Sequence, residues 1–218
     1  MTTDFAQEVA AILLPHLPPG PAREPLAADL GRFCVLLRDA NEHLNLTRIT
    51  DARGMALLHV VDALTALPLL KEAHSVADLG SGCGVPGIPL ALARPDLRVT
   101  LLESRGRKAA ALGAIVRELS LHPRVRVEPM RGEVWLAKQR VDSVVARAVG
   151  RIDEVLALLA PVHRGFRRLV LFKGPTVDAE LAGLTTRSLA ALGFGQPRRV
   201  EATLPDGERR VLLSFTTR

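Results

Sequence analysis

The chain contains little of the chemistry that stabilises small secreted or metal-binding proteins. Its 218 residues include only two cysteines, Cys34 and Cys83, which lie far apart without a histidine or cysteine neighbour at ligand spacing. We therefore expect neither a disulfide framework nor a zinc site, and we assign no metal ligand. Tyrosine is absent and aromatic residues make up 3% of the chain, which argues against a recognition surface built on stacked bases.

Targeting and membrane-spanning signals are also missing. The start, MTTDF, has no basic region that leads into an apolar core, so we expect no secretory signal. No segment approaches the ~20 apolar residues of a membrane span. With 48% hydrophobic and 24% charged residues, the composition is that of a folded soluble protein. We expect a cytoplasmic monomer without a membrane partner.

Basic residues are in excess, and almost all of them are arginine. The chain has 29 Lys and Arg residues against 23 Asp and Glu, a net charge of +6 and a pI of about 10.3. This balance favours a polyanionic partner such as nucleic acid. Only Lys71, Lys108, Lys138 and Lys173 are lysines, and GC-rich coding alone can produce such an arginine bias. Charge by itself therefore leaves nucleic-acid binding undecided.

The chain divides into a helical start and a longer alternating part. Leucines at helical spacing around Phe33 indicate one long helix, and Asp51 is placed to cap another that runs to Leu67. From Ser75 onward, short apolar runs alternate with helical stretches. Strands are predicted at Val76–Leu79, Val99–Glu103, Val125–Glu128, Val141–Ala146 and Leu169–Phe172, with helices near 87–93, 105–119, 152–160 and 176–192.

This alternation predicts an α/β fold, in which a mostly parallel, Rossmann-like sheet carries helices on both faces. Two final runs, Val200–Leu204 and Val211–Phe215, flank a turn at residues 205–207 and predict an antiparallel hairpin at one edge of the sheet. We thus expect a small helical N-terminal region, residues 1–69, followed by a sheet domain, residues 70–218.

A glycine-rich stretch, DLGSGCGVPGIP at residues 78–89, follows the first predicted strand. Open α/β sheets bind ligands beyond the carboxyl ends of their strands, and the first strand-to-helix turn is the favoured place. Residues 82–87 match the GxGxxG pattern of dinucleotide sites, and Glu103 lies about 20 residues on, where a ribose-binding acid is expected. A tight turn that needs glycine only for its geometry is a further alternative.

Asp78 favours a different cofactor, S-adenosylmethionine. Its carboxylate ends the strand two residues before Gly80, where it would repel a pyrophosphate but suits a ligand with a sulfonium and an α-amino group. Gly80, Gly82 and Gly84 would let the backbone pass close to this ligand. Glu103 can accept both ribose hydroxyls. The predicted hairpin agrees with this choice, because methyltransferase sheets commonly end in an antiparallel strand.

Several motifs occur in an order shared with a known family. The most specific is the glycine-rich stretch with its continuation, PGIPLALARP. The others, over roughly residues 40–175, are NLTRI from Asn45, His59 with Asp62, VTLLES followed by Arg107-Lys108, Arg131-Gly132-Glu133, ARAVGRI from Ala146, and Phe172-Lys173-Gly174. Together they resemble the bacterial small-subunit ribosomal RNA guanine-N7 methyltransferases, called RsmG or GidB. The resemblance implies a class I methyltransferase fold and S-adenosylmethionine as cofactor.

The resemblance also implies roles for individual residues. It places Gly80, Val85, the pair Gly132-Glu133 and Arg147 at the cofactor. A backbone amide and a carbonyl at 132–133 can contact the adenine edge, while Val85 packs on the ring. Arg147 ends the fourth strand, where its guanidinium can orient the methionine carboxylate or hold an RNA phosphate. Both alternatives stay open.

Four residues are candidates for positioning the substrate: Asn45, Arg48, His59 and Lys173. Asn45 can bond a guanine edge or cap the following turn, and we expect Arg48 beside it to contact a phosphate. His59 lies three residues before Asp62, so the two can form a base-like pair or a structural one. Lys173 ends the fifth strand, where it is either an RNA-phosphate contact or a solvated loop charge.

The sequence thus predicts transfer of a methyl group from S-adenosylmethionine to the N7 of a guanine in small-subunit (16S) ribosomal RNA, with the RNA or the small subunit as partner. Guanine N7 has an exposed lone pair, so the reaction needs alignment and desolvation more than a general base. We therefore assign no catalytic acid or base. Two other functions compete: a nicotinamide-dependent oxidoreductase, and a non-catalytic RNA-binding or ribosome-assembly protein.

Overall fold

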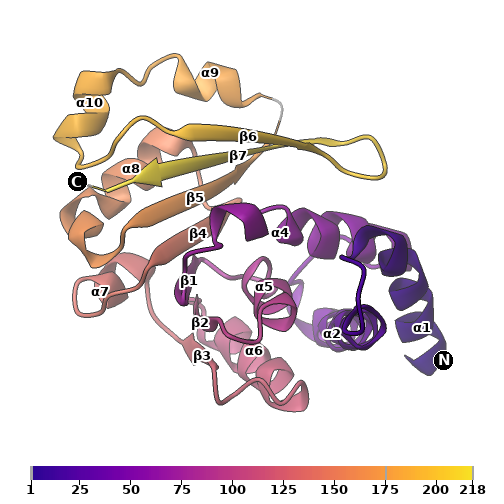
Figure 1. Ribbon diagram of the computed structural model, residues 1–218. Helices are drawn as coiled ribbons and strands as arrows, with labels where there is room; N and C mark the ends of the chain where they lie inside the picture. The colour runs from indigo at the N-terminus through magenta and orange to yellow at the C-terminus, as the bar shows by residue number, and fades with distance from the viewer. Residues whose placement is uncertain (1, 175, 218) are drawn as a thin grey trace.

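The computed structural model describes residues 2–174 and 176–217, and over these ranges it contains one seven-stranded sheet with the order β3-β2-β1-β4-β5-β7-β6 (Figure 1). The strands from β3 to β5 are parallel, whereas β7 is antiparallel to both β5 and β6. The predicted mostly parallel sheet with a C-terminal hairpin is confirmed. The strands are β1 Ser75–Leu79, β2 Arg98–Leu102, β3 Val125–Glu128, β4 Ser143–Arg147, β5 Arg168–Lys173, β6 Arg198–Thr203 and β7 Arg209–Thr216.

The fourth strand begins later than predicted, at Ser143 instead of Val141. Asp142 lies before the strand and binds the start of β1. Its Oδ2 accepts hydrogen bonds from the amides of His74 and Ser75 and from the Ser75 hydroxyl, at 2.9 to 3.0 Å. These bonds join the starts of β1 and β4 before the regular pairing begins.

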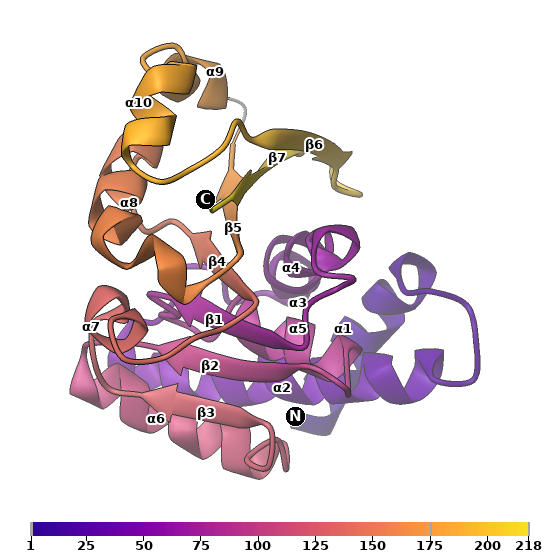
Figure 2. The same cartoon turned by 60° about the vertical axis from the view of Figure 1, so that its left-hand side comes forward.

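Helices cover both faces of the sheet (Figures 1 and 2). The α-helices are α1 Thr2–Leu13, α2 Arg23–Leu44, α3 Ala52–Gly54, α4 Asp62–Leu64, α5 Gly87–Ala93, α6 Gly106–Glu118, α7 Gly132–Leu136, α8 Ile152–Leu159, α9 Val177–Leu181 and α10 Thr186–Ala191. A π-helical segment, η2 Met55–Val61, separates α3 from α4, and the 3₁₀ segments are η1 Leu14–His16, η3 Leu67–Leu69 and η4 Ala160–Gly165.

Capping side chains show where two of the predicted helical stretches begin. The predicted cap at Asp51 is confirmed, since its Oδ1 accepts a hydrogen bond from the Gly54 amide at 2.8 Å. The single helix predicted at 176–192 is wrong, because the structure has two short helices there, α9 and α10. Thr185 starts the second one, where its hydroxyl accepts a hydrogen bond from the Ser188 amide at 3.1 Å.

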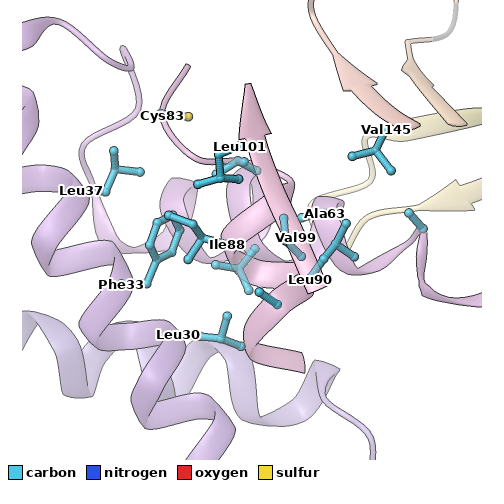
Figure 3. Close-up of a cluster of buried hydrophobic side chains, with 14 of the residues drawn as sticks. Leu30, Phe33, Leu37, Ala63, Cys83, Ile88, Leu90, Val99, Leu101 and Val145 are labelled. Carbon is cyan, nitrogen blue, oxygen red and sulfur yellow. The ribbon is translucent and has the colours of Figure 1, made fainter. Parts of the chain in front are cut away.

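Apolar side chains form clusters on both faces of the sheet. In β1, Val76 belongs to one cluster whereas Ala77 and Leu79 belong to the other, as the two-residue period of a strand requires. The first cluster also contains side chains of α2 and α5, and Figure 3 shows Phe33 pointing toward Ile88. The helical start and the sheet thus share one core. The domain boundary at residues 69–70 stays a prediction.

One helical stretch in the described chain is more apolar than expected. Ala52–Leu69 has a mean hydropathy of 1.3 over 18 residues and is long enough to cross a bilayer, so the expectation that no segment approaches a span is wrong. However, 56% of this stretch is buried inside the protein, where it packs against α1, α2 and α5. Its apolar side chains form part of the core.

Replacing Phe33 with alanine tests whether the helical start and the sheet fold together. Phe33 is fully buried, and removing a buried phenylalanine side chain typically costs about 3–5 kcal/mol of stability. We expect the urea transition to shift to lower denaturant, with circular dichroism and the fluorescence of Trp135, on the opposite face of the sheet, changing together.

The matched control for this experiment is Val134→Ala, at a side chain that is 49% exposed. This change should alter the free energy of unfolding by less than about 0.5 kcal/mol. A Phe33→Ala protein that loses helical signal while the Trp135 transition stays in place would contradict the shared core.

Candidate active site

The candidate site lies where the strand order reverses, at the carboxyl ends of β1 and β4. β1 pairs with β2 on one side and with β4 on the other, which is where open α/β sheets bind ligands. The glycine loop leaves β1 at this point and runs from Gly80 to Gly87, the first residue of α5. Gly80, Gly82 and Gly84 have φ angles of 68°, 56° and 85°, which only glycine adopts readily. A Cβ at Gly84 would also lie 2.7 Å from the Ile88 side chain.

Acidic side chains hold the glycine loop through backbone amides. Glu103 accepts hydrogen bonds from the amide of Gly82 at 3.1 Å and from the amide of Arg105 at 2.8 Å. Asp78 Oδ2 accepts one from the Gly87 amide at 3.0 Å. A pyrophosphate would need such amides for itself and would face the two carboxylates. The loop therefore argues against a nicotinamide dinucleotide, although its sequence matches the GxGxxG pattern.

Asp78 lies beneath this loop and is 1% exposed. Burial raises the pKa of its carboxyl group to about 7, opposed by the hydrogen bond from Gly87 and the charge of Arg147. Among the described residues, no group donates a hydrogen bond to its buried Oδ1. The structure thus places the carboxylate against the loop and not in an open pocket, which corrects the predicted direct contact with a ligand.

A first pocket of about 170 Å³ opens between the ends of β1 and β2 and the start of α7. It brings together four of the predicted cofactor residues, Gly80, Glu103, Gly132 and Glu133. The other lining residues are Leu79, Leu102, Ser104, Met130, Arg131, Val149 and Leu158. The pocket therefore combines an acidic group with apolar walls, as a nucleoside requires.

Four predicted cofactor residues do not line this pocket: Asp78, described above, Gly82, Val85 and Arg147. Val85 is 4% exposed and belongs to the core, so the expectation that it packs on an adenine ring is not met. Gly82 contributes through its amide, which is bonded to a carboxylate. The exposed apolar surface comes instead from Met130, Val149 and Leu158. These three residues were not predicted, because a lone apolar residue in a loop or helix carries no signal of exposure.

A second pocket, of about 260 Å³, adjoins the first at the ends of β4 and β5, and Val149 lines both. Three cationic side chains, Arg147, Lys173 and Arg210, line it beside apolar groups such as Phe172. Arg210 was not predicted. It follows a turn near the C-terminus, and nothing in the sequence indicates that the hairpin returns to this end of the sheet.

Asp62 holds two of these cations in a buried ion-pair cluster. Its side chain is 1% exposed, with Oδ2 3.1 Å from Arg147 Nη1 and Oδ1 2.6 Å from Arg210 Nε. Arg147 Nη1 also donates to the Leu58 carbonyl at 2.7 Å. The guanidinium of Arg147 is thereby fixed between the helical region and the sheet, at the wall of the second pocket.

His59 adjoins this cluster without bonding to Asp62. Its Nδ1 lies 3.4 Å from Arg147 Nη2, and its Nε2 lies 2.9 Å from the Thr47 hydroxyl. The predicted direct pair of His59 and Asp62 is therefore wrong, because Arg147 contacts both. Burial, together with the charge of Arg147, lowers the pKa of His59 to about 4. The imidazole is thus neutral at neutral pH.

Lys173 is neither solvated nor free. Its ammonium lies 2.7 Å from Glu180 Oε2 and donates to the Gly150 carbonyl at 2.8 Å, and its side chain is 11% exposed. The alternative of a solvated loop charge is therefore wrong. Its other predicted role, an RNA-phosphate contact, would require the ion pair with Glu180 to open.

Asn45 and Arg48 lie at the end of α2, away from both pockets. Asn45 ends the helix in a left-handed conformation, with φ 46° and ψ 55°, and its amide donates to the Asn41 carbonyl. The predicted cap on the following turn is wrong, because Asn45 caps the preceding helix. Arg48 is exposed and forms no ion pair within the described ranges.

Comparisons with known proteins agree with this geometry. The family model described as "GidB: rRNA small subunit methyltransferase G" matches residues 27–198. The "Ribosomal RNA small subunit methyltransferase G" of Solibacter usitatus is 41% identical, covering 82% of this chain and 83% of that protein. The protein of the same name from Rhodopirellula baltica is 38% identical and covers 88% and 90%.

Solved structures show the same fold at low identity. The N-terminal domain of human METTL16, in complex with SAH, has a TM-score of 0.61 at 12% identity and covers 97% of this chain and 94% of that one. The mitomycin 7-O-methyltransferase MmcR has a TM-score of 0.55 at 18% identity, with 96% and 75% covered. The predicted class I methyltransferase fold is confirmed. The chain belongs to the GidB family, the S-adenosylmethionine-dependent small-subunit rRNA methyltransferases G.

Proposed function

We propose that the protein transfers the methyl group of S-adenosylmethionine to the N7 of a guanine in small-subunit ribosomal RNA. The observation that carries this proposal is the pair of adjoining pockets at the carboxyl end of the sheet in a member of this family. The first has the groups that a nucleoside needs, and the second has cationic and apolar groups that suit a nucleotide. A cytoplasmic, monomeric enzyme remains our prediction.

The first pocket fits the adenosine part of the cofactor. Glu103 is 7% exposed and uses one lone pair of each carboxylate oxygen on a backbone amide, so the others can accept ribose hydroxyls. The start of α7 at Gly132 and Glu133 provides a polar edge, and Met130 and Leu158 provide apolar faces. A Cβ at Gly132 would overlap the Leu79 side chain, so glycine is required for the close approach of α7 to β1.

The second pocket fits the acceptor guanine. S-adenosylmethionine supplies an electrophilic methyl group on a sulfonium, and guanine N7 offers a lone pair without deprotonation. Arg147 is held by Asp62 and the Leu58 carbonyl, so it can present a fixed donor to the guanine O6 and leave N7 free. His59 is suited to orient Arg147 and not to accept a proton, because its pKa is lowered to about 4.

The decisive experiment is methylation of ribosomal RNA by the purified protein. Labelled S-adenosylmethionine is supplied with whole small subunits and, separately, with RNA stripped of protein, and the product is mapped by mass spectrometry. We expect N7-methylguanosine at one position. Methylation of another atom would overturn the N7 assignment, and the absence of methyl transfer to either substrate would favour the non-catalytic RNA-binding protein.

Glu103→Gln tests the proposed ribose contact. Glutamine keeps the shape but loses the charge, and a hydrogen bond to a charged group contributes about 1.5–3 kcal/mol, or roughly ten- to hundred-fold in affinity. We expect calorimetry to show this loss for both S-adenosylmethionine and S-adenosylhomocysteine, since both carry the ribose. A loss confined to one of the two ligands would rule out Glu103 as the ribose partner.

Asp78→Asn tests whether a buried carboxyl group supports the glycine loop. Its pKa in the folded protein, about 7, lies above its usual value of 3.8, so the folded state binds its proton more tightly. Its contribution to stability is therefore complete below about pH 4 and declines as the pH rises toward 7, by up to roughly 1.4 kcal/mol per pH unit.

The measurement is the free energy of unfolding of both proteins from about pH 4 to pH 8. Asparagine keeps an acceptor for the Gly87 amide but does not titrate, so the difference, wild type minus Asp78→Asn, should fall with pH and level off above about pH 7. A difference that is independent of pH would show that the Asp78 carboxyl group is not perturbed in the folded protein.

A further inference from the structure

A groove of about 370 Å³ lies where the end of α2 meets the start of α6. Its cationic side chains are Arg105, Arg107 and Lys108, and His43 and Asn45 face them from the end of α2. Arg105 and Arg107 are exposed and Lys108 is half-buried. The groove thus combines the N-terminal helical region with the sheet domain.

The two helices that form the groove are packed together along their length. α2 contacts α6, and Arg32 in the middle of α2 lies 3.8 Å from Glu118 at the end of α6. The helices therefore run in opposite directions, which brings the end of α2 to the start of α6. Figures 1 and 2 show the two helices next to each other on the same face of the sheet.

The cations of this groove differ from those of the second pocket in having no counter-ion. Within residues 2–174 and 176–217, none of Arg105, Arg107 and Lys108 forms an ion pair. Lys173 and Arg147, in contrast, are each paired with a carboxylate. Long-range attraction for an anion is therefore retained in the groove and largely neutralised in the pocket.

The direction of α6 adds to this positive potential. The first turn contains two cations and no acidic residue, the reverse of the arrangement that stabilises a helix start. In the free protein this arrangement is unfavourable, and an external anion would relieve it. Among the described residues, no Phe, Tyr or Trp lines the groove, so it offers cations for a sugar-phosphate backbone more than a platform for stacked bases.

The groove is also continuous with the cofactor pocket along the chain. Glu103 and Ser104 line the first pocket, and the groove begins at the next residue, Arg105, whose amide is bonded to Glu103. A polyanion lying in the groove would therefore pass beside the cofactor pocket.

We infer that this groove, and not Lys173, binds the phosphodiester backbone of the substrate RNA next to the nucleotide that is methylated. The inference rests on the proposed function, because it assumes an RNA substrate. Arg105, Arg107 and Lys108 each neutralise one phosphate, and the end of α2 forms the opposite wall.

The test compares two triple variants with the same change in charge and composition. The first is Arg105→Gln, Arg107→Gln and Lys108→Gln. The control is Lys138→Gln, Arg164→Gln and Arg167→Gln, whose side chains are exposed around pockets at the amino ends of the strands. Each protein is titrated with transcribed small-subunit ribosomal RNA over a range of salt concentrations, and with S-adenosylhomocysteine as a measure of the intact cofactor site.

We expect the groove variant to bind S-adenosylhomocysteine normally but RNA about 50-fold more weakly at about 0.15 M salt, with a slope of log K against log salt reduced by about 2 to 2.7. The control should keep its RNA affinity within about threefold, because the charges it removes lie at the amino ends of the strands, opposite the groove, where salt screens their effect on RNA bound there.

Each other outcome has a separate meaning. An equal loss of RNA affinity in both variants would overturn the proposed role of the groove, because the change in net charge alone would then explain the loss. A loss of S-adenosylhomocysteine binding in the groove variant alone would also overturn it, because those side chains would then belong to the cofactor site. Failure of the wild-type protein to bind or methylate the RNA would instead contradict the proposed function.

Discussion

A single buried carboxylate, Asp62, connects the parts of the molecule that build the second pocket. One of its oxygens pairs with Arg147 of β4 and the other with Arg210 of β7, while Asp62 itself begins α4. Breaking a buried ion pair costs about 3–5 kcal/mol, because the remaining charge has lost its partner in a poorly hydrated interior. The helical region therefore shapes this pocket although it contributes none of its lining residues.

Carboxylates also decide how the glycine loop and the cations are used. Because Glu103 and Asp78 occupy amides of the loop, the loop is suited to a ligand without phosphates. Asp62 pairs with Arg147, and Glu180 pairs with Lys173. Because their charges are neutralised, these cations near the reaction centre can position the reacting groups but attract RNA only weakly. Attraction of a polyanion is left to unpaired side chains elsewhere, which separates RNA capture from alignment of the reacting groups.

The sequence by itself determined the order of the elements and the family. Alternating apolar runs and helical stretches predicted all strands of the sheet, because strand and helix periods are local properties of the chain. The glycine-rich stretch and Glu103 pointed to the first pocket, where we place the cofactor, for a similar reason. Both lie at the carboxyl ends of predicted strands, and the carboxyl ends of parallel strands lie at one edge of a sheet. Asp51 was recognisable as a helix cap because a cap involves only neighbouring residues.

Only the tertiary structure decided what the charged side chains contact. Asp62 and Arg210 are 148 residues apart, and Lys173 at the end of β5 pairs with Glu180 of α9. The same holds for Val85, which belongs to the core and does not line the first pocket. Burial, ion pairing and pKa depend on which distant segments pack together, so a residue's type and spacing can nominate it for a site but cannot show whether its charge is free.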